Sequence, residues 1–336
     1  MATIKDVAKK CGYSVCTVSR ALSGKGYLKE ETKQKIMAAV EELGYRPNAL
    51  AVNLKTGRRQ TLALILPSLT NIYYPKLEKY LEAYATEKGY IIYLNNTEYN
   101  LEKEKQIVDN LIGMDIAGVI ITPTSGEHAH IMKLAEYNIP YVYLNRYFED
   151  DVEHCLQMDN KTAAHDAVDY MIKLGHKHIG GIFQSFDNST YRDRYEGMLA
   201  AMEEHGLDCD PGNVMFDVNP EDTGRTPARI LQFLQKPGRP EAIFACNDMT
   251  AFNIYRACYI LGLRIPEHLS VFGYDDCVMA NFVTPPLSTV SVPVKQIASQ
   301  AVAFIHHYIE TGEGQEMPIL KASLMIRNSV RNRNLD

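Results

Sequence analysis

The stretch TIKDVAKKCGYSVCTVSR, residues 3–20, places two short amphipathic segments on either side of a glycine. In the first segment, apolar residues recur at the spacing of one helical face: Ile4, Val7, Ala8 and Cys11. Gly12 is suited to end this helix with a positive φ, and Ser14 is a favourable N-cap for the next one. The pattern therefore predicts a helix, a tight turn and a second helix.

The second helix is expected to bury one apolar stripe and to expose short side chains. The stripe consists of Val18, Ala21 and Leu22. The outward or flanking residues are Val15, Cys16, Thr17, Ser19 and Arg20. This arrangement is typical of a helix-turn-helix whose second helix enters the major groove of DNA, with Thr3 and Ser14 as further DNA contacts. Two small surface helices of an unrelated domain would show the same local pattern. The distribution of charge along the chain helps to separate these two interpretations.

The charge of the chain is distributed unevenly. Residues 1–60 hold twelve Lys or Arg against five Asp or Glu, a net charge of +7, whereas the whole chain carries −6. A basic head on an acidic body is expected when only the head meets phosphate. A third helix over 31–43 can close a small three-helix core with one apolar face, formed by Ile36, Ala39, Val40 and Leu43.

Four short motifs occur together in this head: DVA at 6–8, TVSR at 17–20, ELGYRPN at 42–48 and an Ala-x-x-Leu at 51–54. The combination resembles the lactose/galactose repressor family of bacterial transcription regulators. The resemblance implies a fourth, hinge helix over about 48–54 that orders on operator DNA. It assigns Asn48, Ala51 and Leu54 to the DNA contact, with paired Leu54 side chains wedged into the minor groove so that the site kinks.

Two places depart from the family pattern. Lys29 stands where the family often has a serine that caps the third helix, so this helix is expected to begin less well capped. At the base-reading positions, Val15 and Cys16 form an unusual pair. A known operator half-site is therefore not carried over to this chain.

The rest of the chain alternates apolar, strand-like runs with helical patterns. One series of runs lies at 61–67, 90–96, 117–123 and 139–145, and a second at 178–184, 242–248 and 269–276. Continuous apolar strands between helices predict buried parallel sheets with right-handed crossovers. The resemblance covers essentially the whole chain. It implies an α/β fold in which a three-helix helix-turn-helix head and a hinge helix join a two-lobed, periplasmic-binding-protein-like (type I) core of parallel sheets flanked by helices.

We therefore expect three parts in the chain. Residues 1–47 form the helix-turn-helix DNA-binding domain, 48–60 the hinge helix and linker, and 61–336 the effector-binding and dimerisation core. Within the core, the first lobe is expected to comprise about 61–158 and 291–318, and the second about 159–290 and 319–330.

Ligands of such sheets bind beside the carboxyl ends of the strands, in the crevice between the lobes. Polar and aromatic residues at these ends are Ser68, Asn71, Tyr73, Tyr74, Asn145, Arg146, Asn247, Asp248, Asp275 and Asp276. Amides, carboxylates, an arginine and tyrosine faces together suit a polyol.

The family resemblance adds residue roles to this set. Arg194 matches the effector-binding arginine of the family, and Asn247 and Asp275 match its usual amide and carboxylate. The effector contacts expected from both arguments are Ser68, Tyr73, Asn145, Arg194, Phe216, Asn247 and Asp275. The alternative for any one of them is a turn former or helix cap, as Asn-Asp after a strand often is.

The identity of the effector is less well defined. The stretch GGIFQSFDNSTYRDRYEGM at 180–198, followed by GYDD at 273–276, resembles the effector domain of arabinose-responsive regulators. A purine-binding relative would be expected to carry an extra arginine shortly before Arg194, where Asn188 and Ser189 stand. The expected effector is therefore a sugar, either a pentose or a plant-derived oligosaccharide.

These features favour a repressor that binds a palindromic operator as a homodimer and is released by a small sugar. A regulator that needs a corepressor or a protein co-regulator is one alternative, and a sugar-binding protein of transport is another. An enzyme is not expected, because neither GxGxxG, P-loop, GxSxG nor HExxH occurs and no acid–base set stands out. The absence of terminal leucine heptads argues against a tetramer built by a helical bundle.

Neither a cofactor nor a metal site is expected. The chain has ten histidines, but the pairs His128/His130 and His306/His307 have no third and fourth ligand nearby in sequence. Seven scattered cysteines without a CxxC motif are typical of a reducing cytosol. Neither a signal peptide nor an apolar run long enough to span a bilayer is present, so a cytoplasmic protein without membrane contact is expected.

Overall fold

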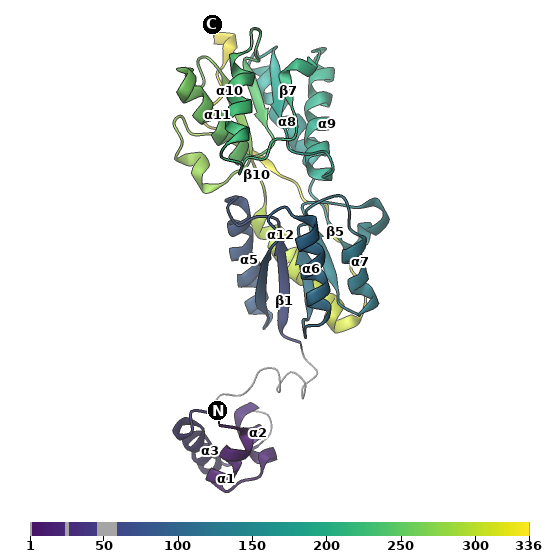
Figure 1. Ribbon diagram of the computed structural model, residues 1–336, viewed down its shortest axis with the longest axis vertical. Helices are drawn as coiled ribbons and strands as arrows, with labels where there is room; N and C mark the ends of the chain where they lie inside the picture. The colour runs from purple at the N-terminus through teal and green to yellow at the C-terminus, as the bar shows by residue number, and fades with distance from the viewer. Residues whose placement is uncertain (1, 24–26, 46–58, 336) are drawn as a thin grey trace. The chain divides into compact units, whose positions relative to one another are not determined.

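The computed structural model describes residues 2–23, 27–45 and 59–335. The chain divides into two compact units, Met1–Arg59 and Gln60–Asp336 (Figure 1). The hinge residues Asn48, Ala51 and Leu54 lie outside the described residues. Within the described ranges, every helix is too short or too polar to cross a membrane.

The first unit is a small three-helix bundle. Its helices are α1 (Ile4–Cys11), α2 (Val15–Ser23) and α3 (Glu30–Glu42). Val7, Val18 and Ile36, one from each helix, are fully buried at its centre. The expected apolar faces of all three helices therefore meet in one core.

The turns of this bundle follow from three cap residues. Gly12 ends α1 with a φ of 74°, a left-handed conformation that glycine adopts without a steric penalty. The side chain of Ser14 accepts a hydrogen bond from the backbone N–H of Thr17 at 3.1 Å, as an N-cap of α2 should. Lys29 precedes α3 without a side-chain cap, which confirms the weaker start expected for this helix.

The second unit begins with a five-stranded parallel sheet. Its strands are β1 (Thr61–Leu66), β2 (Ile91–Asn96), β3 (Gly118–Ile121), β4 (Tyr141–Leu144) and β5 (Cys155–Leu156), in the order β2-β1-β3-β4-β5. Alternate residues of β1 face opposite layers. Leu62 and Leu64 pack in the cluster that includes α5 (Tyr73–Glu87) and α12 (Val294–Thr311). Ala63 and Ile65 pack against α6 (Leu101–Ile112) and α7 (Ala129–Glu136).

A second sheet of six strands forms the other lobe. Its strands are β6 (Ile179–Ile182), β7 (Val214–Met215), β8 (Ala242–Ala245), β9 (Ser270–Asp275), β10 (Ser288–Ser291) and β11 (Ser323–Met325), in the order β11-β10-β9-β8-β6-β7. Only β10 and β11 pair antiparallel among these described strands. The helices α8 (Asn160–Lys173) and α9 (Ser189–Glu204) cover one face, and α10 (Arg225–Gln235) and α11 (Asp248–Leu261) cover the other. The expected α/β architecture of two largely parallel, helix-flanked sheets is confirmed.

The prediction of a buried strand at 90–96 is wrong for most of β2. This strand stands at the edge of its sheet, and Ile91, Tyr93 and Leu94 are 69%, 44% and 37% exposed. A continuous apolar run indicates a strand, but it does not separate a central strand from an edge strand whose apolar side chains lie at the surface.

The chain passes between the two lobes in three segments: after β5, after β10 and before β11. Two of these segments contact each other. Met158 and Leu320 form an isolated parallel bridge, and the backbone N–H of Asp159 donates to the Leu320 carbonyl at 2.9 Å. The crossing segments therefore form a narrow, hydrogen-bonded connection between the lobes.

Close packing of α8 against α9 depends on one glycine. A Cβ at Gly197 would overlap the backbone carbonyl of Lys161 and lie 3.0 Å from the Cβ of Ala164. Glycine at this position lets the two helices approach, and Arg194 lies one turn earlier on α9. Gly197 thereby helps to set the distance between Arg194 and Asn160, which begins α8.

Candidate functional site

The outward face of α2 is the candidate interface on the first unit. Val15 is 40% exposed, and Cys16 and Arg20 are exposed as well, while Thr17 and Ser19 are half-buried. These residues therefore lie outside the core formed by Val18 and Ala21, as the sequence pattern predicts. A short, exposed set of side chains on the second helix of the motif leaves room for close approach to base edges.

Thr3 and Ser14 act within the unit as helix caps. Thr3 begins α1 with a capping box, in which its backbone N–H donates to Asp6 Oδ2 at 2.8 Å and its hydroxyl accepts from the Asp6 N–H. The backbone N–H and the hydroxyl of Thr3 both donate to the Asp6 carboxylate, and these two hydrogen bonds lower the pKa of Asp6. A cap role does not compete with a phosphate contact at the same helix start, so both residues stay predictions as DNA contacts, as do Asn48, Ala51 and Leu54.

The second unit contains a cavity between its lobes, which we call the inner cavity. It has an empty volume of about 490 Å³, including space open to solvent. Its lining residues come from the carboxyl ends of strands in both sheets, from the helices α5, α8 and α9 and from the crossing segments: Asn71, Tyr73, Tyr74, Thr122, Asn145, Arg146, Met158, Asn160, Asn188, Thr190, Tyr191, Arg194, Asn247, Asp275 and Val292. The structure thus brings together Tyr73, Asn145, Arg194, Asn247 and Asp275 from the sequence-predicted effector contacts.

Ser68 and Phe216 do not line this cavity. The hydroxyl of Ser68 donates to Glu221 Oε2 at 2.8 Å and accepts from the backbone N–H of Asn71 at 3.0 Å, so it holds a loop and reaches the opposite lobe. Phe216 packs in an aromatic cluster, with its ring centroid 4.6 Å from that of Phe186 and 5.3 Å from that of Tyr195. Both residues support the walls of the site from outside the inner cavity.

Arg194 is the most constrained side chain of the inner cavity. Although it is charged, it is only 7% exposed. Its Nε donates to Asn160 Oδ1 at 3.0 Å, its Nη1 donates to the Cys246 carbonyl, and its guanidinium carbon lies 3.4 Å from the centre of the Tyr274 ring. The Asp275 carboxylate lies 3.9 Å from Nη1. A buried guanidinium with fixed partners presents its remaining donors in one orientation.

Asp275 lies at the end of β9 in a conformation that few non-glycine residues adopt, with a φ of 116°. Burial raises its pKa to about 8, although the nearby positive charges of Arg194 and Lys76 act to lower it. The neighbouring acids have structural partners instead. Asp276 pairs with Arg327 at 2.6 Å, and Asp248 accepts a hydrogen bond from Thr289.

Two amides illustrate how structural and binding roles combine here. Asn247 lines the cavity, and its side chain also caps α11 by accepting from the Thr250 N–H at 2.8 Å. Asn145 has a φ of 63° and accepts from the Tyr73 hydroxyl at 2.7 Å. The positive φ angles of Asn145 and Asp275 concentrate backbone strain at this cavity, as is common at ligand sites.

Sequence reasoning did not assign Asn160 and Tyr191 to the site. Asn160 follows a crossing segment, and linear sequence does not reveal that it meets Arg194. Tyr191 could have been found from helical spacing, because it lies three residues before Arg194 on α9. Arg146, expected at a strand end, is 5% exposed, and its Nη1 has no hydrogen-bond partner among the residues that the structure describes.

Comparison with known proteins identifies the family. Residues 3–48 match the model for bacterial regulatory proteins of the lacI family, and residues 168–330 match that for a periplasmic binding protein-like domain. The chain is 32% identical to the HTH-type transcriptional repressor PurR of Pasteurella multocida over 336 residues, covering 99% of this chain and 100% of that protein. It is also 32% identical to the ribose operon repressor of Escherichia coli K12, covering 98% of this chain and 100% of that protein.

The chain belongs to the lacI family of bacterial regulatory proteins. The fold also matches the crystal structure of the lac repressor dimer bound to operator and an anti-inducer, with a TM-score of 0.86, 22% identity and 98% and 99% of the two chains covered. This lacI-family protein is therefore a DNA-binding transcriptional regulator, and its relatives are repressors rather than enzymes.

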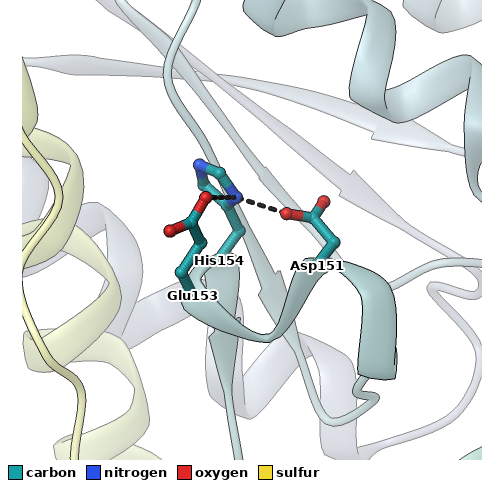
Figure 2. A group of neighbouring side chains, drawn as sticks. All are labelled: Asp151, Glu153 and His154. Atoms are coloured by element: carbon teal, nitrogen blue, oxygen red, sulfur yellow. Dashed lines mark hydrogen bonds and ion pairs between the residues drawn. The ribbon is translucent and has the colours of Figure 1, made fainter.

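One group of side chains in the regulator has the spacing of metal ligands. Asp151, Glu153 and His154 lie together at η1 (Glu149–His154), as Figure 2 shows. The Asp151 carboxylate is hydrogen-bonded to His154 Nδ1, and it accepts a second hydrogen bond from the Tyr141 hydroxyl at 2.8 Å. The His154 ring also stacks on Tyr141, with centroids 4.3 Å apart. These contacts account for the cluster as part of the lobe's structure.

The raised pKa of Asp275 predicts a specific pH dependence. In the unfolded chain, the Asp275 carboxyl group releases its proton when the pH rises above its ordinary pKa of 3.8. In the folded regulator it holds the proton up to about pH 8. The contribution of Asp275 to the free energy of unfolding is therefore complete below pH 3.8 and is lost as the pH rises to about 8. Denaturant unfolding at about pH 5.5 and about pH 8.5 should show wild type losing stability relative to Asp275→Asn as the pH rises.

The exposed Asp208 provides the matched control for this measurement. Asp208→Asn should keep a constant stability difference from wild type over the same range. A constant difference for Asp275→Asn as well would contradict the assignment of a buried, proton-holding carboxyl.

Proposed function

We propose that this regulator is a repressor that binds a palindromic operator as a homodimer and leaves it when a small sugar binds between the lobes of the core. The observation that carries the proposal is the inner cavity, where a buried arginine, the buried carboxyl group of Asp275 and several amides converge. The exposed face of α2 supplies the DNA contact, from Val15, Cys16, Thr17, Ser19 and Arg20. We infer a cytoplasmic location from the proposed DNA target.

The chemistry of the inner cavity supports a polyhydroxylated ligand. Arg194 can donate to a pair of neighbouring hydroxyls, and the Asp275 carboxyl and the Asn247 amide can accept from others. Tyr73, which is buried beside them, can pack its ring on the C–H face of a sugar. The relative named as the ribose operon repressor is in keeping with a sugar-responsive regulator.

Exposed apolar side chains support assembly into a dimer through the core. One group lies at the end of α11 and on η3 (Val278–Asn281) and just after it: Tyr259, Ile260, Val278, Met279 and Phe282. Tyr259 is 86% and Phe282 71% exposed, which is unusual for such large apolar residues in a monomer. A second group is formed by Ile91, Tyr93 and Leu94 on the edge strand β2. A twofold pair of cores would present two heads to a palindrome.

We infer that the effector acts by stabilising the closed arrangement of the lobes. Glu221 on one side of the cavity accepts hydrogen bonds from Ser68 and Thr70 on the other. The backbone N–H of Tyr147 donates to Ser189 Oγ at 3.1 Å, again between the lobes. A ligand that favours this closure would shift the first lobe against its partner in the dimer and change the spacing of the hinge segments at 48–54, so that they no longer pair in the minor groove.

The DNA assignment predicts the effect of removing one exposed side chain of α2. Arg20→Ala should weaken specific operator binding by about 1–3 kcal/mol, because a base or phosphate contact is lost. Gel-shift titration with DNA fragments from the genome that encodes the protein measures this change in affinity. Lys133→Ala, which removes a positive charge from the second unit, serves as the control and should bind normally. Unchanged affinity and footprint for Arg20→Ala would contradict the recognition-helix assignment.

The assembly proposal predicts that a charge on the apolar surface separates the dimer. Phe282→Asp should give a monomer at micromolar concentration, because a carboxylate would be desolvated in the interface. Light scattering provides the measurement. Tyr137→Asp alters a tyrosine that is 53% exposed just after the end of α7, and this variant should remain dimeric. A dimeric Phe282→Asp variant, or a monomeric wild type, would exclude this surface as the interface.

The effector proposal predicts that Arg194→Ala no longer responds to the ligand while it still binds the operator. Thermal-shift screening against a sugar panel identifies the ligand, since saturation at a hundred times its Kd adds about 2.7 kcal/mol of stability. Gel shifts with that sugar then compare wild type with Arg194→Ala. If the ligand is a corepressor, the variant loses operator binding instead. A variant that is released at wild-type sugar concentrations would disprove the role of Arg194.

A further inference from the structure

A second cavity adjoins the inner cavity, and we call it the outer cavity. Its empty volume is about 750 Å³, including space open to solvent. Three residues line both cavities: Arg146, Asn188 and Tyr191. The two spaces therefore share a wall, and a ligand longer than one sugar ring can extend from the first into the second.

Polar groups around the outer cavity are buried without a partner. Among the residues that the structure describes, Tyr99 Oη, Arg146 Nη1 and Gln184 Nε2 have no hydrogen-bond acceptor. Arg146 is 5% and Gln184 is 9% exposed, so neither side chain can readily turn to bulk water. All three residues line the outer cavity, and Tyr99 and Gln184 do not line the inner one. Buried donors of this kind are normally satisfied, which indicates a ligand with acceptor oxygens.

Tyr99 has a backbone conformation that is unfavourable for its residue type. Glu98 and Tyr99 both have a φ of 55°, a left-handed conformation that is rare for a bulky aromatic residue. The backbone N–H of Tyr99 donates to the Pro67 carbonyl at 3.0 Å, which helps to fix the turn. Asp217, on the other side of the outer cavity, also has a φ of 55°. Strained backbone at both walls is typical of a ligand clamp.

Tyr99 lines the outer cavity and interacts electrostatically with residues of the inner one. Burial raises the pKa of its hydroxyl, and Tyr74 and Tyr191 of the inner cavity raise it further, while Arg146 opposes them. The hydroxyl is therefore a neutral donor at physiological pH. Glu221 also acts on Tyr99; its Oε2 accepts hydrogen bonds from Ser68 and Thr70, its Oε1 is buried without a partner among the described residues, and no described ion pair joins it to Arg146.

The outer-cavity lining also includes residues with hydroxyl, amide and carboxylate groups: Thr124, Ser125, Ser185, Asp187, Asn188, Asp217 and Asn219. Such groups bind the hydroxyls of a sugar ring, whereas an aromatic substituent would leave them without partners. We propose that the effector is a disaccharide, with one ring in the inner cavity and the second in the outer cavity. This inference rests on the proposed function and names the ligand class of the same site. Tyr99, Arg146 and Gln184 donate to oxygens of the second ring and of the glycosidic bond.

Calorimetric titration of the intact regulator with matched sugars tests the proposal. The pairs are glucose and cellobiose, galactose and lactose, xylose and xylobiose, and arabinose and arabinobiose, with 4-nitrophenyl glucoside as the aromatic arm. One disaccharide should bind at least about tenfold more tightly than its constituent monosaccharide. Gln184→Ala and Tyr99→Phe should each reduce that preference by about fivefold, because each removes a donor to the second ring.

Two matched variants control for nonspecific effects. Gln232→Ala and Tyr137→Phe alter exposed residues outside both cavities and should keep the full preference. Monosaccharides that bind as tightly as disaccharides and release the operator would overturn the inference and leave the proposed function in place. Tighter binding of the aromatic glycoside than of any disaccharide would overturn the assignment of a second sugar ring. If no sugar binds while operator binding is specific, the inference and the sugar-release proposal both fail.

Discussion

The burial of one positive charge, on Arg194, organises the core of this regulator. Removing a guanidinium from water is costly unless its donors and its charge find partners. Those partners come from separate elements: Asn160 at the start of α8, the Cys246 carbonyl after β8, and the ring face of Tyr274 on β9, with the Asp275 carboxyl group 3.9 Å away. Each of these elements must be in place for the charge to be tolerated. The second lobe is thereby a preformed half of the cavity.

The first lobe completes the cavity through a few hydrogen bonds to the second lobe. Ser68 and Thr70 donate to Glu221, Thr190 donates to the Asn145 carbonyl, and Tyr147 donates to Ser189. Each such hydrogen bond contributes on the order of 1 kcal/mol once the loss of bonds to water is counted. Closure is therefore a balance of small terms rather than a fixed state. A ligand that adds a few contacts to both lobes can shift such a balance.

The sequence was sufficient for the architecture and for the residues that local patterns position. The apolar spacing of α1 and α2, Gly12 at the turn and the alternation of strands with helices each depend on a few neighbouring residues, so they can be read in order. The edge position of β2 could not be predicted, because strand order is a long-range property. For the same reason Asn160 was not recognised, and the sequence placed Arg146 at a strand end without showing that its Nη1 is buried without a partner, since both features depend on what folding brings beside these residues. Ser68 and Phe216 show a limit of this reasoning: residues near the right strand ends need not line the inner cavity.

The position of the inner cavity suggests how binding reaches the rest of the molecule. Met158 and Asn160 lie at one crossing between the lobes, Val292 lies in another, and all three line the cavity. The third crossing is tied to the first by the bridge between Met158 and Leu320. A ligand in the cavity therefore touches the segments about which the lobes must rotate, so no long chain of intervening contacts is required within the core. Allosteric coupling free energies are typically about 1–3 kcal/mol. A coupling of this size therefore needs only one or two hydrogen bonds at these crossings to differ between the open and the closed lobes.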